Sequence, residues 1–128
     1  MAPLSSDTIN LTHPDDLFQK IETVSKAILA RDYATVQTFS REALDKDMTC
    51  VIEEYLSDYP NPLYPWSQEL GKGMRRATQI IDLGNRIFQI EAPFAERVDG
   101  AYDASEMMLI CEYDDNTKAF DFLRVQPL

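Results

Sequence analysis

The sequence predicts an α+β protein, with N-terminal helices packed on a curved, cone-like antiparallel sheet of about four strands. Two observations predict this class. Apolar residues recur at helical spacing through the first half of the chain, whereas segments typical of strands flank two turn signals in the second half. Helices followed by a meander of strands are typical of α+β folds. The 128 residues suit a single domain, 1–128, in which residues 1–11 are expected to form a loose leader.

Three helices are expected before residue 60. A stripe at spacings of four, three and four predicts a helix over about 14–30, formed by Leu17, Ile21, Val24 and Ile28. Asp32 is a capping residue for a shorter second helix. A third helix is expected over about 42–58, where apolar residues again recur at helical period. Residues 59–66 hold three prolines and are expected to be a loop rich in aromatic side chains.

The rest of the chain is expected to form strands, at residues 76–83, 86–94, 106–113 and 118–125. Gly84-Asn85 is a two-residue hairpin signal between the first two of them. Asp114-Asp-Asn-Thr117 is a turn between the last two, and residues 95–105 are expected to be an acidic loop. The strand at 106–113 is apolar on both faces, which indicates a central strand covered on both sides.

Net charge excludes several classes of partner. Twenty-two acidic residues against 12 lysines and arginines give a net charge of −10. Direct nucleic-acid binding needs a basic face, and anionic membranes also attract basic segments, so neither partner is expected. The sequence has neither a long apolar span nor a secretory signal, and a cytoplasmic location is expected. Cys50 and Cys111 are interpreted as buried thiols in a reducing compartment, in preference to a disulfide.

The acidic excess lies in two windows. Window 42–58 has six acidic residues against Lys46, a net charge of −5, and window 96–115 has seven against Arg97, a net charge of −6. The rest of the chain is therefore +1. Helical periodicity aligns Asp47, Glu54 and Asp58 in a stripe. Such a field favours rapid association with a basic protein, although solubility alone is an alternative explanation.

The candidate partner-binding residues combine these acids with aromatic anchors. Tyr and Trp are favoured at interface hot spots as well as in packing over a core. The predicted set is Asp47, Glu54, Asp58, Tyr59, Trp66, Asp99, Asp103, Glu106, Asp114 and Asp115.

No catalytic, cofactor-binding or metal-binding residue is predicted. The only histidine, His13, precedes a helix start and has no orienting group nearby in sequence. Residues 114–118 lack the glycine and the terminal glutamate of a calcium loop, and Gly71-Lys-Gly73 lacks the tail of a P-loop. Two cysteines and one histidine do not make a structural zinc site. We therefore expect a protein that is not an enzyme.

The segment Ile28-Leu-Ala-Arg-Asp-Tyr-Ala34, followed by Val36 and Phe39, resembles the early part of nuclear-transport-factor-2-like domains of the cystatin-like type. The resemblance covers about residues 14–125 in layout. It implies a long helix, a short helix and a bent, cone-forming sheet. Enzymes of that family carry polar residues inside the cone, and other members are small binding proteins, including bacterial immunity proteins.

Together, charge and resemblance lead to one hypothesis and two alternatives. The hypothesis is a non-enzymatic, immunity-type inhibitor that covers the basic surface of a toxin. The first alternative is a small-molecule-binding or catalytic cone, whose inward-facing polar residues would be Tyr33, Tyr55, Arg86 and Glu91. The second alternative is an inhibitor that mimics DNA with its carboxylates.

Overall fold

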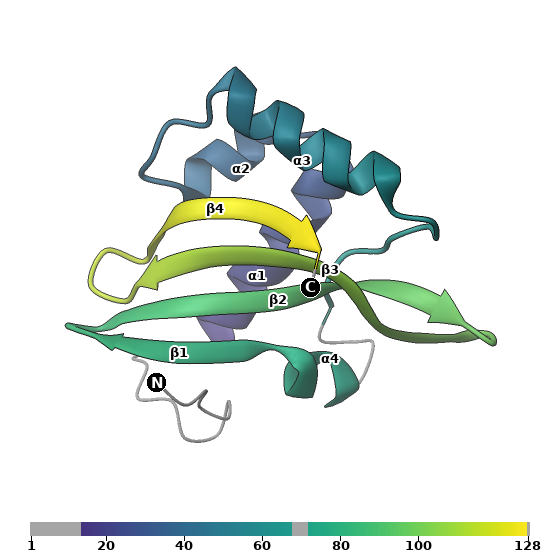
Figure 1. Ribbon diagram of the computed structural model, residues 1–128. Helices are drawn as coiled ribbons and strands as arrows, with labels where there is room; N and C mark the ends of the chain where they lie inside the picture. The colour runs from purple at the N-terminus through teal and green to yellow at the C-terminus, as the bar shows by residue number, and fades with distance from the viewer. Residues whose placement is uncertain (1–13, 68–71, 128) are drawn as a thin grey trace.

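The computed structural model describes residues 14–67 and 72–127; the expected leader and His13 lie outside this part of the chain. Within these two ranges, four helices precede four strands (Figure 1). In chain order they are α1 (Pro14–Leu29), α2 (Tyr33–Phe39), α3 (Lys46–Asp58), α4 (Lys72–Ala77), β1 (Gln79–Gly84), β2 (Ile87–Val98), β3 (Ala101–Asp114) and β4 (Ala119–Pro127). The predicted α+β class is confirmed, and the sheet is curved and unclosed.

The helix starts follow local capping. Asp32 accepts a hydrogen bond from the Thr35 N–H at 3.2 Å and begins α2 where the sequence predicts. Asp45 accepts from the Met48 N–H at 2.9 Å, so α3 begins at Lys46 rather than at residue 42. The residues before Asp45 are held outside the helix by Gln37, whose amide oxygen accepts from the Leu44 N–H at 2.8 Å.

The sheet is an antiparallel meander in the order β1-β2-β3-β4. The acidic loop expected at 95–105 is wrong, because β2 and β3 continue as a paired hairpin as far as Val98 and Ala101. Asp99 and Gly100 make the turn with φ of 52° and 82°. An Asp-Gly pair supplies the left-handed geometry that a tight hairpin requires, but the sequence interpretation did not use this signal. We call residues 95–106 the acidic hairpin.

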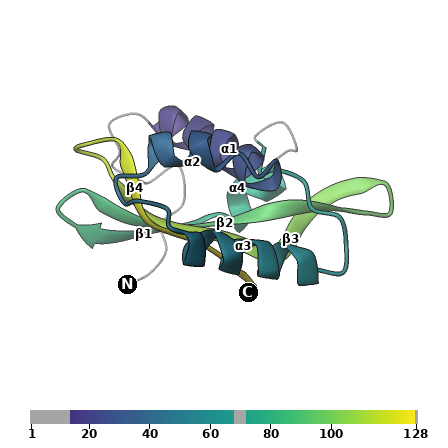
Figure 2. The ribbon, with the colours of Figure 1, turned by 90° about the horizontal axis from the view of Figure 1, so that it is seen from above.

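The core lies between α1 and the sheet. Figures 1 and 2 show α1 across one face of the sheet and α3 along its β4 edge. Trp66 is 0% exposed and stacks on Phe18 of α1 with ring centroids 5.7 Å apart. Its indole N–H donates to the Thr78 hydroxyl at 2.8 Å, and its backbone N–H donates to Ser25 at 2.8 Å. The proline-rich loop is therefore fastened to the core by its tryptophan.

Strand β3 is central, as predicted. It pairs with β2 on one side and β4 on the other, and both of its faces are buried. Leu109 belongs to the core on the α1 side, whereas Ile110 is buried on the other face between its register partners Glu91 and Arg124. None of the described helices is long and apolar enough to cross a membrane.

Candidate functional site

The acidic hairpin carries charge that its own strands do not neutralise. Of its four acidic residues, Asp99, Asp103 and Glu106 are exposed and Glu96 is half-buried; Arg97 is its one basic residue. Glu96 and Asp103 are direct register partners on neighbouring strands. Like charges placed directly opposite each other oppose strand pairing. Electrostatic repulsion between Glu96 and Asp103 therefore opposes the pairing of the two hairpin strands.

Tyr59 joins the two acidic windows. It follows the last residue of α3, and its hydroxyl donates to a carboxylate oxygen of Glu96 at 3.0 Å while accepting from the Glu106 N–H at 3.3 Å. Asn61 also donates to Glu96, at 3.2 Å. Burial of the phenol, together with its bond to Glu96, raises the pKa of Tyr59 above its ordinary value. The hydroxyl consequently stays protonated and links the end of α3 to the acidic hairpin.

The exposed side of α3 has acids and apolar side chains next to each other. Asp47, Glu54 and Asp58 are exposed and fall on one stripe, as predicted. Val51, 46% exposed, and Tyr55, 36% exposed, lie between that stripe and the buried face. Apolar side chains within a charged surface are typical of protein interfaces. This stripe and the acidic hairpin, joined at Tyr59, form what we call the acidic surface.

Cys50 also lies on α3. The sequence interpretation of Cys50 as a buried thiol is wrong, because it is exposed; Cys111 is buried as expected, and both thiols are free. Burial raises the pKa of the Cys111 thiol, so it is not a nucleophile at neutral pH.

The opposite end of β3 is electrostatically different. Asp114 and Asp115 are buried, although the sequence places them among the partner-binding acids. The side chain of Asp115 is 1% exposed; it pairs with Arg86 and lies 2.5 Å from the Lys118 ammonium. Asp114 lies 3.1 Å from Arg41. These two carboxylates therefore hold the fold together rather than contribute to an exposed surface. We call residues 114–118, with Arg41 and Arg86, the paired turn.

Asp114 has a lowered pKa. Burial by itself raises the pKa of Asp114. Hydrogen bonds from Asn116 and Thr117, together with the charge of Arg41, lower it by more than burial raises it. The Asn116 N–H donates to it at 2.8 Å. A carboxylate held in this way stays ionised, which fits a structural role for the paired turn.

Trp66 is likewise a structural residue. The sequence places it among the anchors for a partner, but its complete burial leaves no surface for contact. The other aromatic anchor predicted from the sequence, Tyr59, is half-buried at the acidic surface.

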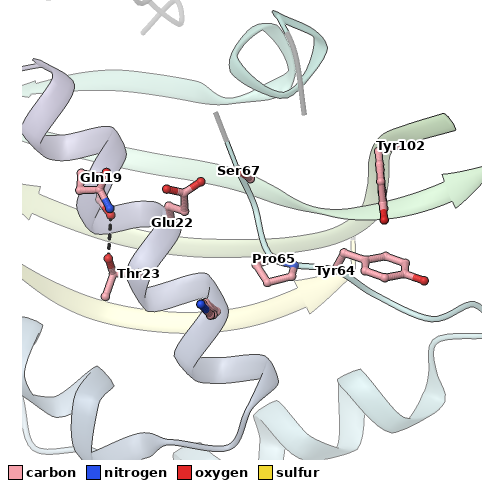
Figure 3. A pocket seen from close by; sticks show the side chains of 8 residues that line it. Gln19, Glu22, Thr23, Tyr64, Pro65, Ser67 and Tyr102 are labelled. Atoms are coloured by element: carbon pink, nitrogen blue, oxygen red, sulfur yellow. Dashed lines mark hydrogen bonds between the residues drawn. The ribbon is translucent and has the colours of Figure 1, made fainter. Parts of the chain in front are cut away.

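A cleft of about 590 Å³ lies beside the acidic hairpin (Figure 3). Its walls come from the polar side of α1, the loop at 64–67 and Tyr102 of the hairpin. Tyr64 meets Tyr102 edge to face at 5.1 Å, and the guanidinium of Arg97 lies 5.8 Å from the centre of the Tyr102 ring. Sequence reasoning missed this cleft because its walls come from three separate segments.

The four polar residues expected inside a cone do not converge. Tyr33 donates to Glu53 at 3.4 Å, and Tyr55 is exposed on α3. Arg86 belongs to the paired turn, and Glu91 accepts from Gln89 at 2.8 Å. Trp66, Phe18 and their buried neighbours occupy the space between α1 and the sheet. Within the described ranges, no cluster of three or more His, Cys, Asp or Glu residues could hold a metal ion.

Comparisons with known proteins return no match, either to a family model, to a curated protein or to a solved structure. The resemblance to nuclear-transport-factor-2-like domains therefore stays a prediction.

Proposed function

We propose that this protein binds a basic protein partner through the acidic surface. The observation that supports this most is the contact of Tyr59 with Glu96 and Glu106, which joins two acidic windows far apart in the sequence. Acidity for solubility alone requires no such junction. An uncompensated field raises association rates with a basic partner and is screened by salt.

More specifically, we propose that the protein is an immunity-type inhibitor of a toxin. Toxins that act on nucleic acid need a basic surface to hold phosphates, and an acidic protein seated on that surface would exclude the substrate. The exposed side chains of Val51, Tyr55, Val98 and Tyr102 lie among the acids and would supply apolar contact area. Inhibition then results from occlusion, and the proposal requires no chemical step on this chain.

The test is a calorimetric titration against a panel of purified basic nuclease toxins, with a small basic protein of no toxic activity as control. Tight binding of a toxin that also stops cleavage of its substrate supports the proposal. Replacing both Asp99 and Asp103 with Lys should then weaken binding at least tenfold. Raising the salt concentration should narrow the difference in affinity between the parent and this variant.

A matched variant controls for net charge. Asp15→Lys with Asp82→Lys changes the net charge from −10 to −6, as the hairpin pair does, at exposed positions outside the acidic surface. If the two double variants lost affinity equally, only net charge would matter, and the acidic surface would be rejected as the binding site. Failure of every toxin to bind would reject the inhibitor.

A second candidate function rests on the cleft in Figure 3. Its volume of about 590 Å³ lies within the range of small-molecule sites, and its two tyrosines offer aromatic faces and hydroxyls. A thermal-shift screen of small aromatic and cationic ligands would support it if a hit lost its effect in Tyr64→Ala. Hits that are indifferent to this substitution would reject the cleft as the site.

A further inference from the structure

The edge strand β4 contains a bulge that turns an aromatic side chain outwards. Along β3, the register partner changes from Arg124 at Ile110 to Asp121 at Glu112, so Phe122 and Leu123 together oppose one residue. Phe122 has a φ of 52°, a left-handed conformation that is uncommon for a bulky side chain. Bulges at sheet edges frequently re-aim a side chain.

The two bulge residues have opposite environments. Leu123 is 2% exposed and belongs to the core, whereas Phe122 is 56% exposed. A regular strand would have left this edge without a projecting aromatic ring. The unfavourable backbone conformation is therefore coupled to the display of Phe122, a combination that favours a functional explanation.

Phe122 borders a groove between α3 and β4. Two hollows of about 280 and 450 Å³ share Met48, Leu123 and Arg124 as walls, and we call them together the α3–β4 groove. Val51 lines the first hollow and Phe122 the second. The groove thus has an apolar floor with an exposed aromatic side chain at one end and an exposed aliphatic side chain at the other.

The rim of the groove is acidic. Asp47 lines the first hollow, and Glu42 and Asp45 line the second, against the single cation Arg124. A symmetric contact with a second copy of this chain would place one acidic rim against another, because a two-fold interface uses the same patch on both subunits. Charge complementarity instead favours a partner segment that carries basic residues around its apolar ones.

We propose that the α3–β4 groove binds an amphipathic basic segment of a protein, whose apolar side chains pack on Met48, Val51 and Phe122 while its lysines or arginines face the acidic rim. The inference rests on the proposed function, because it assigns to the basic partner a second point of attachment. Asp47 belongs to both the acidic stripe and the rim, so the two surfaces adjoin along α3.

The experiment compares two synthetic peptides of equal length and charge, an amphipathic Leu/Lys helix and a version in which serine replaces every leucine. Fluorescence anisotropy measures their affinity for the full chain at low and high salt. The Leu/Lys peptide should bind at least tenfold more tightly, and its advantage should persist at high salt, because apolar contacts are not screened.

Variants then locate the binding. Val51→Ser with Phe122→Ser should lower the affinity for the Leu/Lys peptide at least tenfold and leave that for the serine peptide unchanged. Phe122→Gly removes the ring but suits the left-handed φ, so it should fold at least as well as the parent and still bind more weakly. Leu83→Ser, an exposed apolar position on β1, is the matched control and should change nothing.

The outcomes separate this inference from the proposed function. Equal binding of both peptides, weakened by reversing Asp99 and Asp103, would overturn the groove and leave the acidic surface in place. Binding of the Leu/Lys peptide alone, indifferent to those reversals, would keep the groove and count against the acidic surface. Dimerisation that depends on Phe122 in sedimentation equilibrium would make a second copy the occupant and overturn the inference. Binding of neither peptide would overturn the groove, whereas the acidic surface is tested separately by the toxin titration.

Discussion

The two ends of β3 are both rich in acidic residues, yet they differ in what those acids do. In the paired turn, Asp114 and Asp115 are buried against three basic side chains: Arg41, Arg86 and Lys118. In the acidic hairpin, Glu96 and Asp103 face each other across the strands. A window of sequence that contains both ends therefore combines acids that stabilise the fold with acids that strain it.

Distance along the strand explains why the two ends are independent. β3 has 14 residues, and at about 3.3 Å per residue it extends over roughly 40 Å. This is several times the screening length of about 8 Å at physiological ionic strength. The cations of the paired turn consequently do not offset the charge of the acidic hairpin, and Figure 1 shows the two at opposite ends of the sheet.

The largest expected effect is at the paired turn. Asp115→Asn should lower the free energy of unfolding by about 1.5–3 kcal/mol, because Arg86 and Lys118 lose the buried carboxylate to which they donate charged hydrogen bonds. Urea denaturation measures the change. Asp103→Asn in the acidic hairpin is the control and should not destabilise the protein. A similar loss in both variants would contradict the difference between the two ends.

Next in size is the link between α3 and the acidic hairpin. Tyr59→Phe keeps the ring but removes the hydroxyl that contacts Glu96 and Glu106, at a cost of about 1 kcal/mol. Hydrogen exchange at the hairpin amides should accelerate. Tyr55→Phe, at an exposed position on α3, should leave exchange unchanged. An unaltered exchange pattern in Tyr59→Phe would mean that Tyr59 does not hold the two acidic windows together.

A smaller effect of opposite sign is expected within the hairpin. Asp103→Lys replaces a like-charge pair with an opposite-charge pair beside Glu96 and should raise the free energy of unfolding by about 0.5 kcal/mol. The same variant should weaken the proposed partner binding. Asp82→Lys, on β1, controls for net charge in the binding measurement. Destabilisation by Asp103→Lys would show that the hairpin is not strained by its charge.

The smallest expected effect is the pH response of Asp114. Its folded pKa lies below the unfolded value of 3.8, so the folded state favours the charged form. Its stabilising contribution is therefore present above pH 3.8 and is lost as the pH falls through the lower, folded pKa. Acid denaturation curves of Asp114→Asn should be flatter in this window. If the variant lost stability with falling pH as steeply as the parent, the role assigned to Asp114 would be contradicted.

Much of the fold could be predicted from local sequence. The apolar stripe identifies α1, Asp32 marks the start of α2, and Gly84-Asn85 marks the first hairpin. These elements could be predicted because each signal comes from residues close together in the sequence. The errors have local causes as well. Because residues 96–103 are rich in acids, parts of two strands were interpreted as a loop. Helix α4 was missed, because residues 76 and 77 were expected to begin the first strand.

The candidate site was less predictable. Asp47, Glu54 and Asp58 are exposed on one stripe as expected, since helical periodicity determines their alignment. Trp66, Asp114 and Asp115 are buried. Their burial was not predicted because it depends in part on contacts with residues far away in sequence: Ser25, Arg41 and Arg86. Phe122 was missed because a bulge reverses the side to which its ring would point in a regular strand.

The sequence by itself determined the amount of charge, its two windows and the order of helices and strands. Only the tertiary structure decided which acids are neutralised. Arg41 meets Asp121 across 80 positions and Arg86 meets Asp115 across 29. Pairing over such separations depends on strand register and on where α2 ends, which local patterns do not encode. The number of carboxylates can therefore be read from the sequence. Which of them stabilise the fold, and which are exposed on the acidic surface, is decided by the tertiary structure.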